Sequence, residues 1–192
     1  MYLPDGTIRH RRRSINLPNH AHELTFSCYQ GYKLLSKDRT RQWMVDALNR
    51  ARREHELQLW SYVIMPEHVH VVLLPERSDY QMGPILKSIK EGVAKRAINF
   101  LKRKGSRWLE RLTVRHPNGE IDRHFWQPGG GYDRNIVTMK ALVASVHYLH
   151  ANPVRRGLVV QPTEWGWSSA RWYEGEKDVK LELDATMPQL SL

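Results

Sequence analysis

The sequence contains almost no cysteine and no long apolar run. Its single cysteine, Cys28, excludes an internal disulfide and a cysteine-rich zinc site. No apolar stretch approaches the roughly 20 residues that a membrane-spanning helix needs. Neither a signal-peptide core nor a long basic amphipathic helix is evident. These absences together indicate a protein of the reducing cytoplasm that does not bind membranes.

Acidic residues are also scarce relative to basic ones. The 192 residues include 30 Lys and Arg but only 20 Asp and Glu, which gives a formal net charge of +10. A charge of this size favours a polyanionic partner, and nucleic acid is the first candidate. The length fits one domain with a substantial core and does not demand a second domain.

Composition divides the chain into three parts. Residues 1–21 form a basic arm, and the sequence leaves open whether this arm contacts phosphate or is only solvated. Residues 22–173 carry the regular patterns and are expected to form a single domain. Residues 174–192 are expected to form a flexible, acidic tail.

Hydrophobic periodicity predicts an α+β fold. Strand patterns cover residues 22–30, 57–65 and 68–74, and helical patterns cover residues 38–56 and 82–104. The order strand, helix, strand, strand, helix begins a ferredoxin-like or RRM-like antiparallel sheet with its helices packed on one face. The other face of the sheet would then be free for a ligand.

The second half of the domain is less regular. We expect a short strand at residues 108–115, a returning strand at residues 121–127 and a glycine loop at residues 128–131. A final helix should begin at residues 133–135 and end at Asn152, because the residue before a proline disfavours the helical conformation.

The most informative stretch is residues 61–74, in which an apolar strand pattern carries His68 and His70. Alternate side chains of a strand lie on the same face, roughly 6.5 Å apart along the backbone. Both rings could therefore reach one metal ion. Taken alone, the pair is more readily explained as two half-buried core histidines, so its meaning depends on the rest of the chain.

Tyr148 and Asn152 would complete such a site. At positions i and i+4 of the last predicted helix they share one face. Two imidazoles, an amide oxygen and a phenol around one point suit metal-assisted phosphodiester chemistry, in which the tyrosine attacks phosphorus. The ligand set suits Mg²⁺ or Mn²⁺. From the residues alone, a packed tyrosine and an asparagine that merely precedes Pro153 remain open alternatives.

Four sequence blocks resemble the single-tyrosine HUH transposases and, within them, the REP-associated tyrosine transposases. They occur in the family order within residues 22–173, although the glycine loop is about one residue longer than the family spacing. The blocks are Pro66-Glu-His-Val-His70, Phe125-Trp-Gln127 with Tyr132-Asp-Arg134, Tyr148-Leu-His-Ala-Asn-Pro-Val-Arg-Arg-Gly157, and Trp165-Gly-Trp-Ser-Ser169.

The resemblance implies a ferredoxin-like catalytic domain whose nucleophile is Tyr148. It implies that His68 and His70 bind the divalent metal, Mg²⁺ or Mn²⁺, and that Asn152 takes the place of the third polar ligand. It also implies a single-stranded or hairpin DNA substrate and a 5′-phosphotyrosine intermediate. The histidine and tyrosine faces could come from one chain or from the two chains of a homodimer.

Two other function classes compete with this one. A domesticated protein could keep the fold and bind hairpin or single-stranded DNA in regulation with little cleavage. A small metal hydrolase is disfavoured, because the chain has only two clustered histidines and no carboxylate-rich motif.

Further DNA contacts are expected from the basic arm, from the outer face of the helix at residues 82–104, and from the second family block. A glutamine at a strand end and an arginine at a helix start are also common without any contact to DNA. We expect Trp165 and Trp167 to pack against the sheet rather than to stack on bases. The candidate DNA-binding residues are Arg11, Arg12, Arg13, Lys87, Lys90, Lys102, Gln127 and Arg134.

Overall fold

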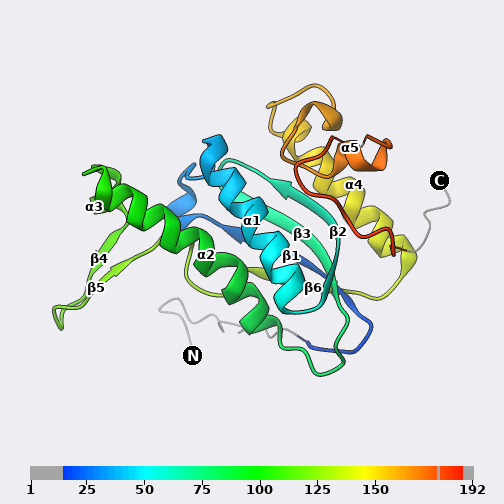
Figure 1. Ribbon diagram of the computed structural model, residues 1–192, viewed down its shortest axis with the longest axis horizontal. Coiled ribbons are helices and arrows are strands. Elements are labelled where there is room, and N and C mark those ends of the chain that lie inside the picture. The colour runs from blue at the N-terminus through cyan, green and yellow to red at the C-terminus, as the bar shows by residue number, and fades with distance from the viewer. Residues whose placement is uncertain (1–14, 177, 188–192) are drawn as a thin grey trace, which may run out of the picture.

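A four-stranded antiparallel sheet forms the centre of the molecule, which is described by a computed structural model for residues 15–176 and 178–187 (Figure 1). The strands lie in the spatial order β2-β3-β1-β6. The register between β1 and β3 sets Thr25 opposite His70 and Ser27 opposite His68. The strand bounds are Ala21–Ser27 for β1, Leu57–Ile64 for β2, His68–Pro75 for β3 and Tyr132–Ile136 for β6.

Two long helices, α1 (Asp38–Glu54) and α2 (Met82–Arg103), cover one face of the sheet. Their apolar sides join one core with Val69, Val71 and Leu73, the alternate residues of β3. The elements β1, α1, β2, β3, α2 and β6 follow the β-α-β-β-α-β order of a ferredoxin-like fold. The predicted α+β class is therefore confirmed. Within the described residues, no helix is both long and apolar enough to cross a membrane.

The opposite face of the sheet is covered by a helix. We had expected this face to be open. α4 (Met139–Arg155) packs on this face through an apolar stripe that includes Val146 and Leu149. Val63 and Val72 of the sheet belong to the same cluster. Since β3 alternates, its histidines point toward α4 and away from α1 and α2.

The fourth strand of the sheet lies where the sequence suggested the start of a helix. The sequence of β6 does not alternate between apolar and polar residues. The strand forms because its polar side chains pair individually with residues of β1. Asp133 lies 2.6 Å from His22, and Arg134 pairs with Glu23. A strand stabilised in this way is invisible to an analysis of hydrophobic periodicity.

A small hairpin replaces the returning strand that we predicted. β5 (Ile121–Arg123) pairs with β4 (Thr113–Arg115) in a separate two-stranded sheet. The short helix α3 (Trp108–Arg111) begins the segment before them. The strand predicted over residues 108–115 is therefore confirmed only for β4, because α3 occupies its first residues. The strand predicted over residues 121–127 is confirmed only for β5, which pairs with β4 and not with the four-stranded sheet. α3, β4 and β5 lie together at one end of the molecule, beyond the end of α2 (Figure 1).

α4 continues through Pro153 and does not end at Asn152. Pro153 has no N–H to offer the Leu149 carbonyl. The side-chain amide nitrogen of Asn152 lies 2.9 Å from the Tyr148 carbonyl oxygen and 3.4 Å from that of Leu149. Asn152 thereby supplies a donor where proline lacks one, and the helix runs on to Arg155.

The tryptophan segment near the C-terminus packs along β2, as expected. The Trp165 indole N–H donates to the Ile64 carbonyl at 3.1 Å, and the Ile64 N–H donates to the Trp167 carbonyl at 2.9 Å. The Trp167 ring packs against the apolar cluster beneath α1 and α2, and the Trp165 ring packs against the cluster beneath α4. Neither ring is therefore a free stacking surface.

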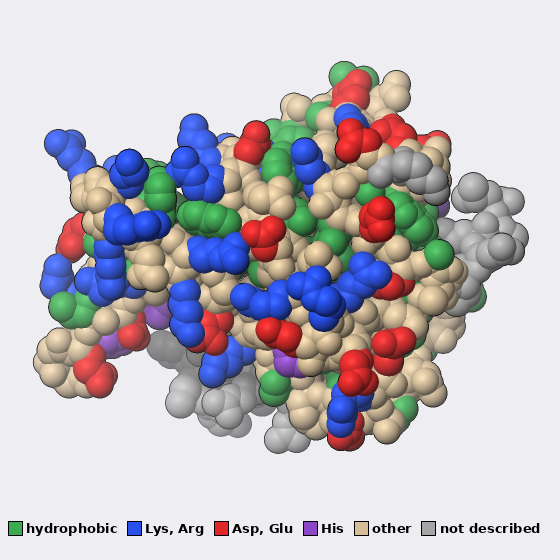
Figure 2. All heavy atoms as spheres, viewed as in Figure 1, with side chains coloured by type: hydrophobic (Ala, Val, Ile, Leu, Met, Phe, Trp, Pro, Cys, Tyr) green, Lys and Arg blue, Asp and Glu red, His purple; other side chains and the backbone are tan. Residues whose placement is uncertain are grey.

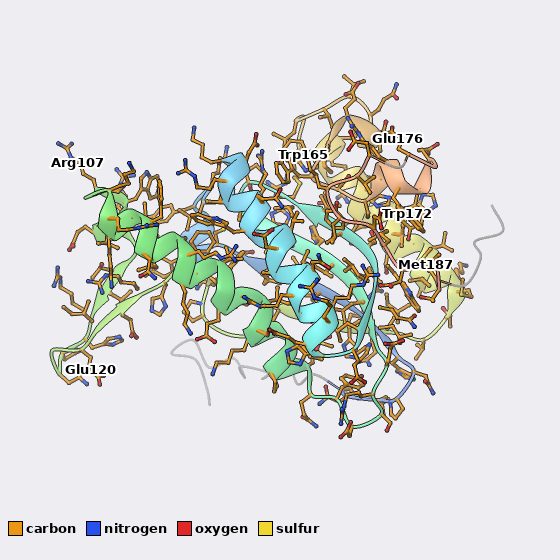
Figure 3. The ribbon with its side chains drawn as sticks, viewed as in Figure 1. Arg107, Glu120, Trp165, Trp172, Glu176 and Met187 are labelled. Atoms are coloured by element: carbon orange, nitrogen blue, oxygen red, sulfur yellow. The ribbon has the colours of Figure 1, made fainter. Side chains whose placement is uncertain are left out.

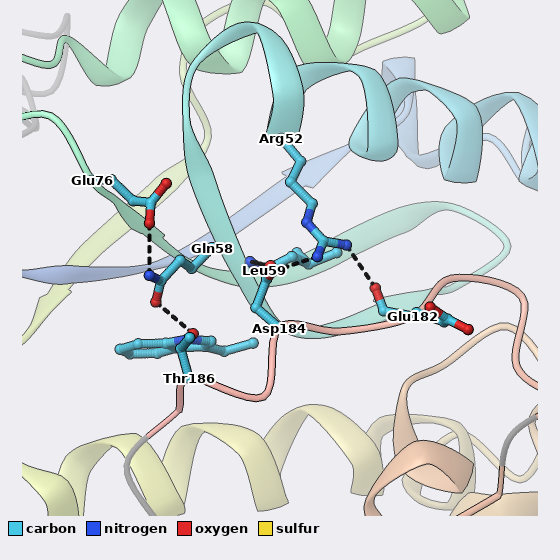
Figure 4. Close-up of polar contacts among 8 residues, drawn as sticks. Arg52, Gln58, Leu59, Glu76, Glu182, Asp184 and Thr186 are labelled. Atoms are coloured by element: carbon cyan, nitrogen blue, oxygen red, sulfur yellow. Dashed lines mark hydrogen bonds and ion pairs between the residues drawn. The ribbon is translucent and has the colours of Figure 1, made fainter.

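The described part of the tail also lies against β2 (Figure 4). We expected a flexible tail from residue 174 onward, but Leu183 is buried in the core. The Asp184 carboxylate accepts a hydrogen bond from the Leu59 N–H at 2.8 Å and pairs with Arg52. Residues 178–187 thus extend the edge of the fold.

Gly131 allows β6 to approach β1. Its φ is +78°, and a Cβ here would lie 2.3 Å from the Thr25 carbonyl oxygen. Gly131→Ala should push β6 away from the residue that faces His70 and lower the free energy of unfolding by about 2 kcal/mol or more. Gly130→Ala is the matched control, because its Cβ would meet only the Leu86 side chain, at 3.9 Å. Urea denaturation checks this, and equal losses in both variants would contradict it.

Candidate active site

His68 and His70 project from β3 toward α4 and meet at their Nε2 atoms, which are 2.9 Å apart. The other nitrogen of each buried ring faces an oxygen. His68 Nδ1 lies 3.0 Å from Glu67 Oε1, and His70 Nδ1 lies 2.7 Å from Thr25 Oγ1. These partners favour a proton on each Nδ1, because a carboxylate accepts hydrogen bonds and a hydroxyl can accept them. The lone pairs of the two Nε2 atoms then face each other.

A divalent cation fits between these two nitrogens. Two facing lone pairs repel each other unless a proton or a cation lies between them. Metal bonds of about 2.0–2.1 Å would hold two adjacent ligands about 3 Å apart, which agrees with the observed separation of 2.9 Å. Contacts from Nδ1 to a carboxylate or hydroxyl are also those that orient metal-binding histidines. The residues present therefore fit the metal that the family resemblance implies.

Burial keeps both imidazoles neutral near pH 7. Removal from water, together with the smaller effects of the charges of His68 and Arg156, lowers the pKa of His70 to about 3. Burial also lowers the pKa of His68, although the Glu67 carboxylate opposes this shift. A neutral ring keeps its Nε2 lone pair available, so a metal would not have to displace a proton.

α4 brings Tyr148 and Asn152 to the same place. The rings of Tyr148 and His70 meet edge to face, with their centroids 6.2 Å apart. Asn152 is buried, and a hydrogen bond with its side chain acts to raise the pKa of His70 against the effect of burial. An amide oxygen has this effect, because it accepts a hydrogen bond from a protonated imidazole. Its amide nitrogen is used by the helix carbonyls, so Oδ1 is the group directed at the site. The four predicted site residues thus come together within one chain.

Beyond His68, His70 and Asn152, a metal would need water or substrate oxygens. Among the described residues, no three His, Cys, Asp or Glu side chains form a metal-binding group. A metal held by two imidazoles and one amide oxygen would keep coordination positions open for a phosphodiester.

Tyr148 is accessible to a large substrate. Its side chain is 46% exposed, and the Arg155 guanidinium carbon lies 4.8 Å from its ring centroid. Arg156 lies 3.8 Å from Glu67. Two arginines therefore stand at the rim of the site, where they would attract phosphate.

A groove near the candidate site is a different feature. It has a volume of about 1060 Å³ and lies between α4 and α5 (Ala170–Tyr173). Figure 3 labels Trp172, Glu176 and Met187, which line it. The residues of the candidate active site are not part of its wall.

Comparison with known proteins bears on this site. No protein-family model matches the chain. A curated Haemophilus influenzae protein named among the REP-associated tyrosine transposases is 23% identical over 176 residues, which covers 87% of this chain and 90% of the relative. An Escherichia coli K12 REP-associated tyrosine transposase is 26% identical over 130 residues, covering 67% of this chain and 63% of the relative.

A solved structure of a REP-associated tyrosine transposase bound to a REP hairpin has a TM-score of 0.61 to this chain. The match is 21% identical and covers 94% of each chain. The resemblance to the REP-associated tyrosine transposases is confirmed. At this level of identity the structural match shows a shared fold, and the roles of individual residues are argued from the geometry.

The predicted DNA contacts are spread widely over the molecule. Lys87 and Lys102 are exposed on α2, where Figure 2 shows a band of basic side chains. Arg11, Arg12 and Arg13 lie outside the described residues. Their contact with DNA remains a prediction.

Lys90 and Gln127 hold a loop in this structure. The Lys90 ammonium donates to the carbonyl oxygens of Gln127, at 3.3 Å, and Gly129, at 2.8 Å. Burial lowers the pKa of Lys90. The Gln127 side-chain oxygen accepts a hydrogen bond from the Gln30 N–H at 3.1 Å. A contact between Lys90 and phosphate would have to compete with these bonds.

Arg134 links the sheet to the tyrosine helix. Its guanidinium lies 2.5 Å from Glu23 Oε2 and 2.7 Å from Ser145 Oγ, which in turn donates to Glu23 at 2.8 Å. Ser145 precedes Tyr148 by three residues on α4, so this contact fixes the helix relative to β1.

Arg134→Ala should lower the free energy of unfolding by about 2–4 kcal/mol, because it leaves the buried Glu23 carboxylate with one neutral partner. Adding Glu23→Gln to that variant should restore most of the loss. Urea denaturation of both variants measures this. An Arg134→Ala variant with native stability and weaker DNA binding would instead identify Arg134 as a simple DNA contact.

The sequence analysis missed four residues that support the site. Glu67 directly precedes His68 and could have been proposed as its partner from sequence alone. Thr25 becomes visible only when the register between β1 and β3 is known. Glu23 and Ser145 depend on the contact between β1 and α4, which no local pattern predicts.

Proposed function

We propose that this protein is a metal-dependent single-stranded DNA endonuclease and strand transferase that recognises hairpin DNA. The observation that carries the proposal is the approach of Tyr148 to the facing Nε2 atoms of His68 and His70. The relatives named as transposases support the enzyme class. The solved complex with a REP hairpin supports hairpin DNA as the partner.

Tyr148 would act as the nucleophile. Its phenol oxygen forms a bond to phosphorus while the bond to the 3′ oxygen breaks. The phenol proton passes to solvent, and the leaving oxygen takes up a proton to become a 3′-hydroxyl. The other fragment stays attached to Tyr148 by a 5′-phosphate ester, which keeps the bond energy for rejoining.

His68, His70 and Asn152 would hold the divalent ion. When bound, such an ion polarises the phosphate and stabilises the leaving oxygen. Thr25 and Glu67 orient the two rings through their Nδ1 atoms. The buried rings stay neutral, so they remain ligands at physiological pH.

Arg155 would assist the nucleophile. An unperturbed tyrosine has a pKa near 10, so its phenol needs activation before it attacks at neutral pH. The Arg155 guanidinium lies over the Tyr148 ring, so it would attract the phosphate to the phenol oxygen. The histidine and tyrosine faces meet within one chain, which supports catalysis by a single chain and does not require the homodimer.

Incubation with Mn²⁺ and a labelled oligonucleotide that carries a hairpin and single-stranded flanks tests the proposal. We expect an adduct that survives denaturant, together with a released fragment ending in a 3′-hydroxyl. Chelation by EDTA should prevent both. Hairpin binding without any adduct would contradict the enzyme and favour a DNA-binding regulatory protein.

A further inference from the structure

The end of the molecule around α3 carries a basic cluster for which no ion pair is found among the described residues. Residues 102–111 contain five basic residues and one acidic residue, Glu110. All five are exposed, and no ion pair is found for them within the described part of the chain, whereas Glu110 pairs with Arg115 at 2.9 Å. Figure 2 shows Lys and Arg side chains gathered at this end, where Figure 3 labels Arg107. The five are Lys102, Arg103, Lys104, Arg107 and Arg111.

Aromatic rings run alongside this cluster. Trp108 lies 5.4 Å from Tyr32, Tyr32 lies 6.4 Å from Tyr29, and Tyr29 lies 5.3 Å from His124, measured between ring centroids. Trp108 is 38% exposed, and the Arg111 guanidinium carbon is 4.9 Å from its ring. We call the basic cluster and these four rings the α3 corner.

The aromatic row begins at the histidine end of the sheet. Ser27, the last residue of β1, lies opposite His68. The next residue, Cys28, donates its N–H to the Glu67 carbonyl at 2.7 Å, and Leu35 donates to the Pro66 carbonyl at 2.8 Å. The loop that carries Tyr29 and Tyr32 is therefore hydrogen-bonded to the turn that leads into the candidate metal pair. A DNA strand leaving the active site in this direction would follow the row.

Rings interleaved with unpaired cations form the combination that binds single-stranded nucleic acid. The rings stack on bases and the cations contact phosphates. Within a base-paired stem the bases already stack on one another, so only the terminal pair could stack on such a ring. The chemistry of the α3 corner therefore favours unpaired nucleotides over the hairpin stem.

We propose that the α3 corner binds the single-stranded DNA that flanks a hairpin. Trp108 stacks on an unpaired base, and Arg107 and Arg111 contact the neighbouring phosphates. This inference rests on the proposed function, since it assumes the same DNA as the partner. It adds a site for the flank, at a distance from the reacting phosphate.

Fluorescence anisotropy with two oligonucleotides tests the inference. One carries a hairpin with a single-stranded flank, and the other carries the same hairpin with blunt ends. Trp108→Ala should weaken binding of the flanked oligonucleotide about tenfold and change binding of the blunt hairpin less than about twofold. Trp108→Phe, which keeps a stacking ring, should retain most of the affinity for the flank.

The salt dependence of binding supplies a second readout. Arg107→Gln and Arg111→Gln should each make the logarithmic salt dependence for the flanked oligonucleotide shallower by about 0.7, the value for one phosphate contact on a single strand. Arg115→Gln is the matched control, because this exposed arginine is already paired with Glu110. Its slope should equal that of the wild type.

Equal losses on both oligonucleotides, or none on either, would overturn the inference. Equal losses would mean that the α3 corner contacts the hairpin stem or stabilises the fold. No loss would mean that the α3 corner does not contact the DNA. The adduct with wild-type protein is scored separately. If no adduct forms but Trp108→Ala still weakens binding of the flank alone, the proposed function fails and the flank site stands.

Discussion

Tyr148→Phe should eliminate the covalent DNA adduct and leave a folded protein that still binds hairpin DNA. The change removes one oxygen from a side chain that is 46% exposed, and it keeps the ring that faces His70 and Arg155. We expect the free energy of unfolding to change by less than about 0.5 kcal/mol. The adduct should fall below detection on a denaturing gel, because the attacking atom is absent.

Tyr132 provides the matched control for this variant. It lies on β6 opposite Thr25, which in turn lies opposite His70, so it is a second tyrosine on the same face of the sheet. Tyr132→Phe should keep the adduct. An adduct that persists in Tyr148→Phe and disappears in Tyr132→Phe would reverse the assignment of the nucleophile.

His70→Ala should abolish metal-dependent cleavage while hairpin binding changes little. His70 contacts His68, Thr25 and the Tyr148 ring, so its loss removes a proposed metal ligand at the centre of the site. We expect the cleavage rate to fall more than about 100-fold, since even residues that only orient a metal ligand account for 10- to 100-fold. Hairpin affinity should stay within about twofold, because phosphate contacts dominate it.

Calorimetric titration of Mn²⁺ into the protein without DNA separates this effect from catalysis. The wild type should bind the ion, and His70→Ala should not. Thr25→Val is the graded control: it removes the oxygen at His70 Nδ1 and should weaken metal binding by about 10- to 100-fold without abolishing it. Native cleavage rates in both His68→Ala and His70→Ala would exclude the metal assignment.

Local spacing was sufficient to predict the two halves of the site. The alternation of a strand puts His68 and His70 on one face, and the pitch of a helix puts Tyr148 and Asn152 on one face. Each of these rules concerns residues a few positions apart. The first three strands and the two long helices follow from equally local patterns, and their predicted bounds agree with the structure to within a few residues.

Features that depend on contacts between distant segments escaped prediction. β6 is a strand because Asp133 and Arg134 find partners on β1, more than 100 residues earlier in the chain. α4 continues past Pro153 because Asn152 bonds to the helix carbonyls, which reverses the usual effect of proline. The packing of α4 on the histidine face likewise depends on matching two apolar surfaces from different parts of the chain.

Peptide mapping of the adduct trapped with wild-type protein and Mn²⁺ tests the central claim most directly. The account predicts a nucleotide on the peptide that contains Tyr148, linked through the 5′-phosphate of the DNA, with a free 3′-hydroxyl on the released fragment. A nucleotide on Tyr132, on Tyr62 or on any other residue, or a linkage through a 3′-phosphate, would contradict it.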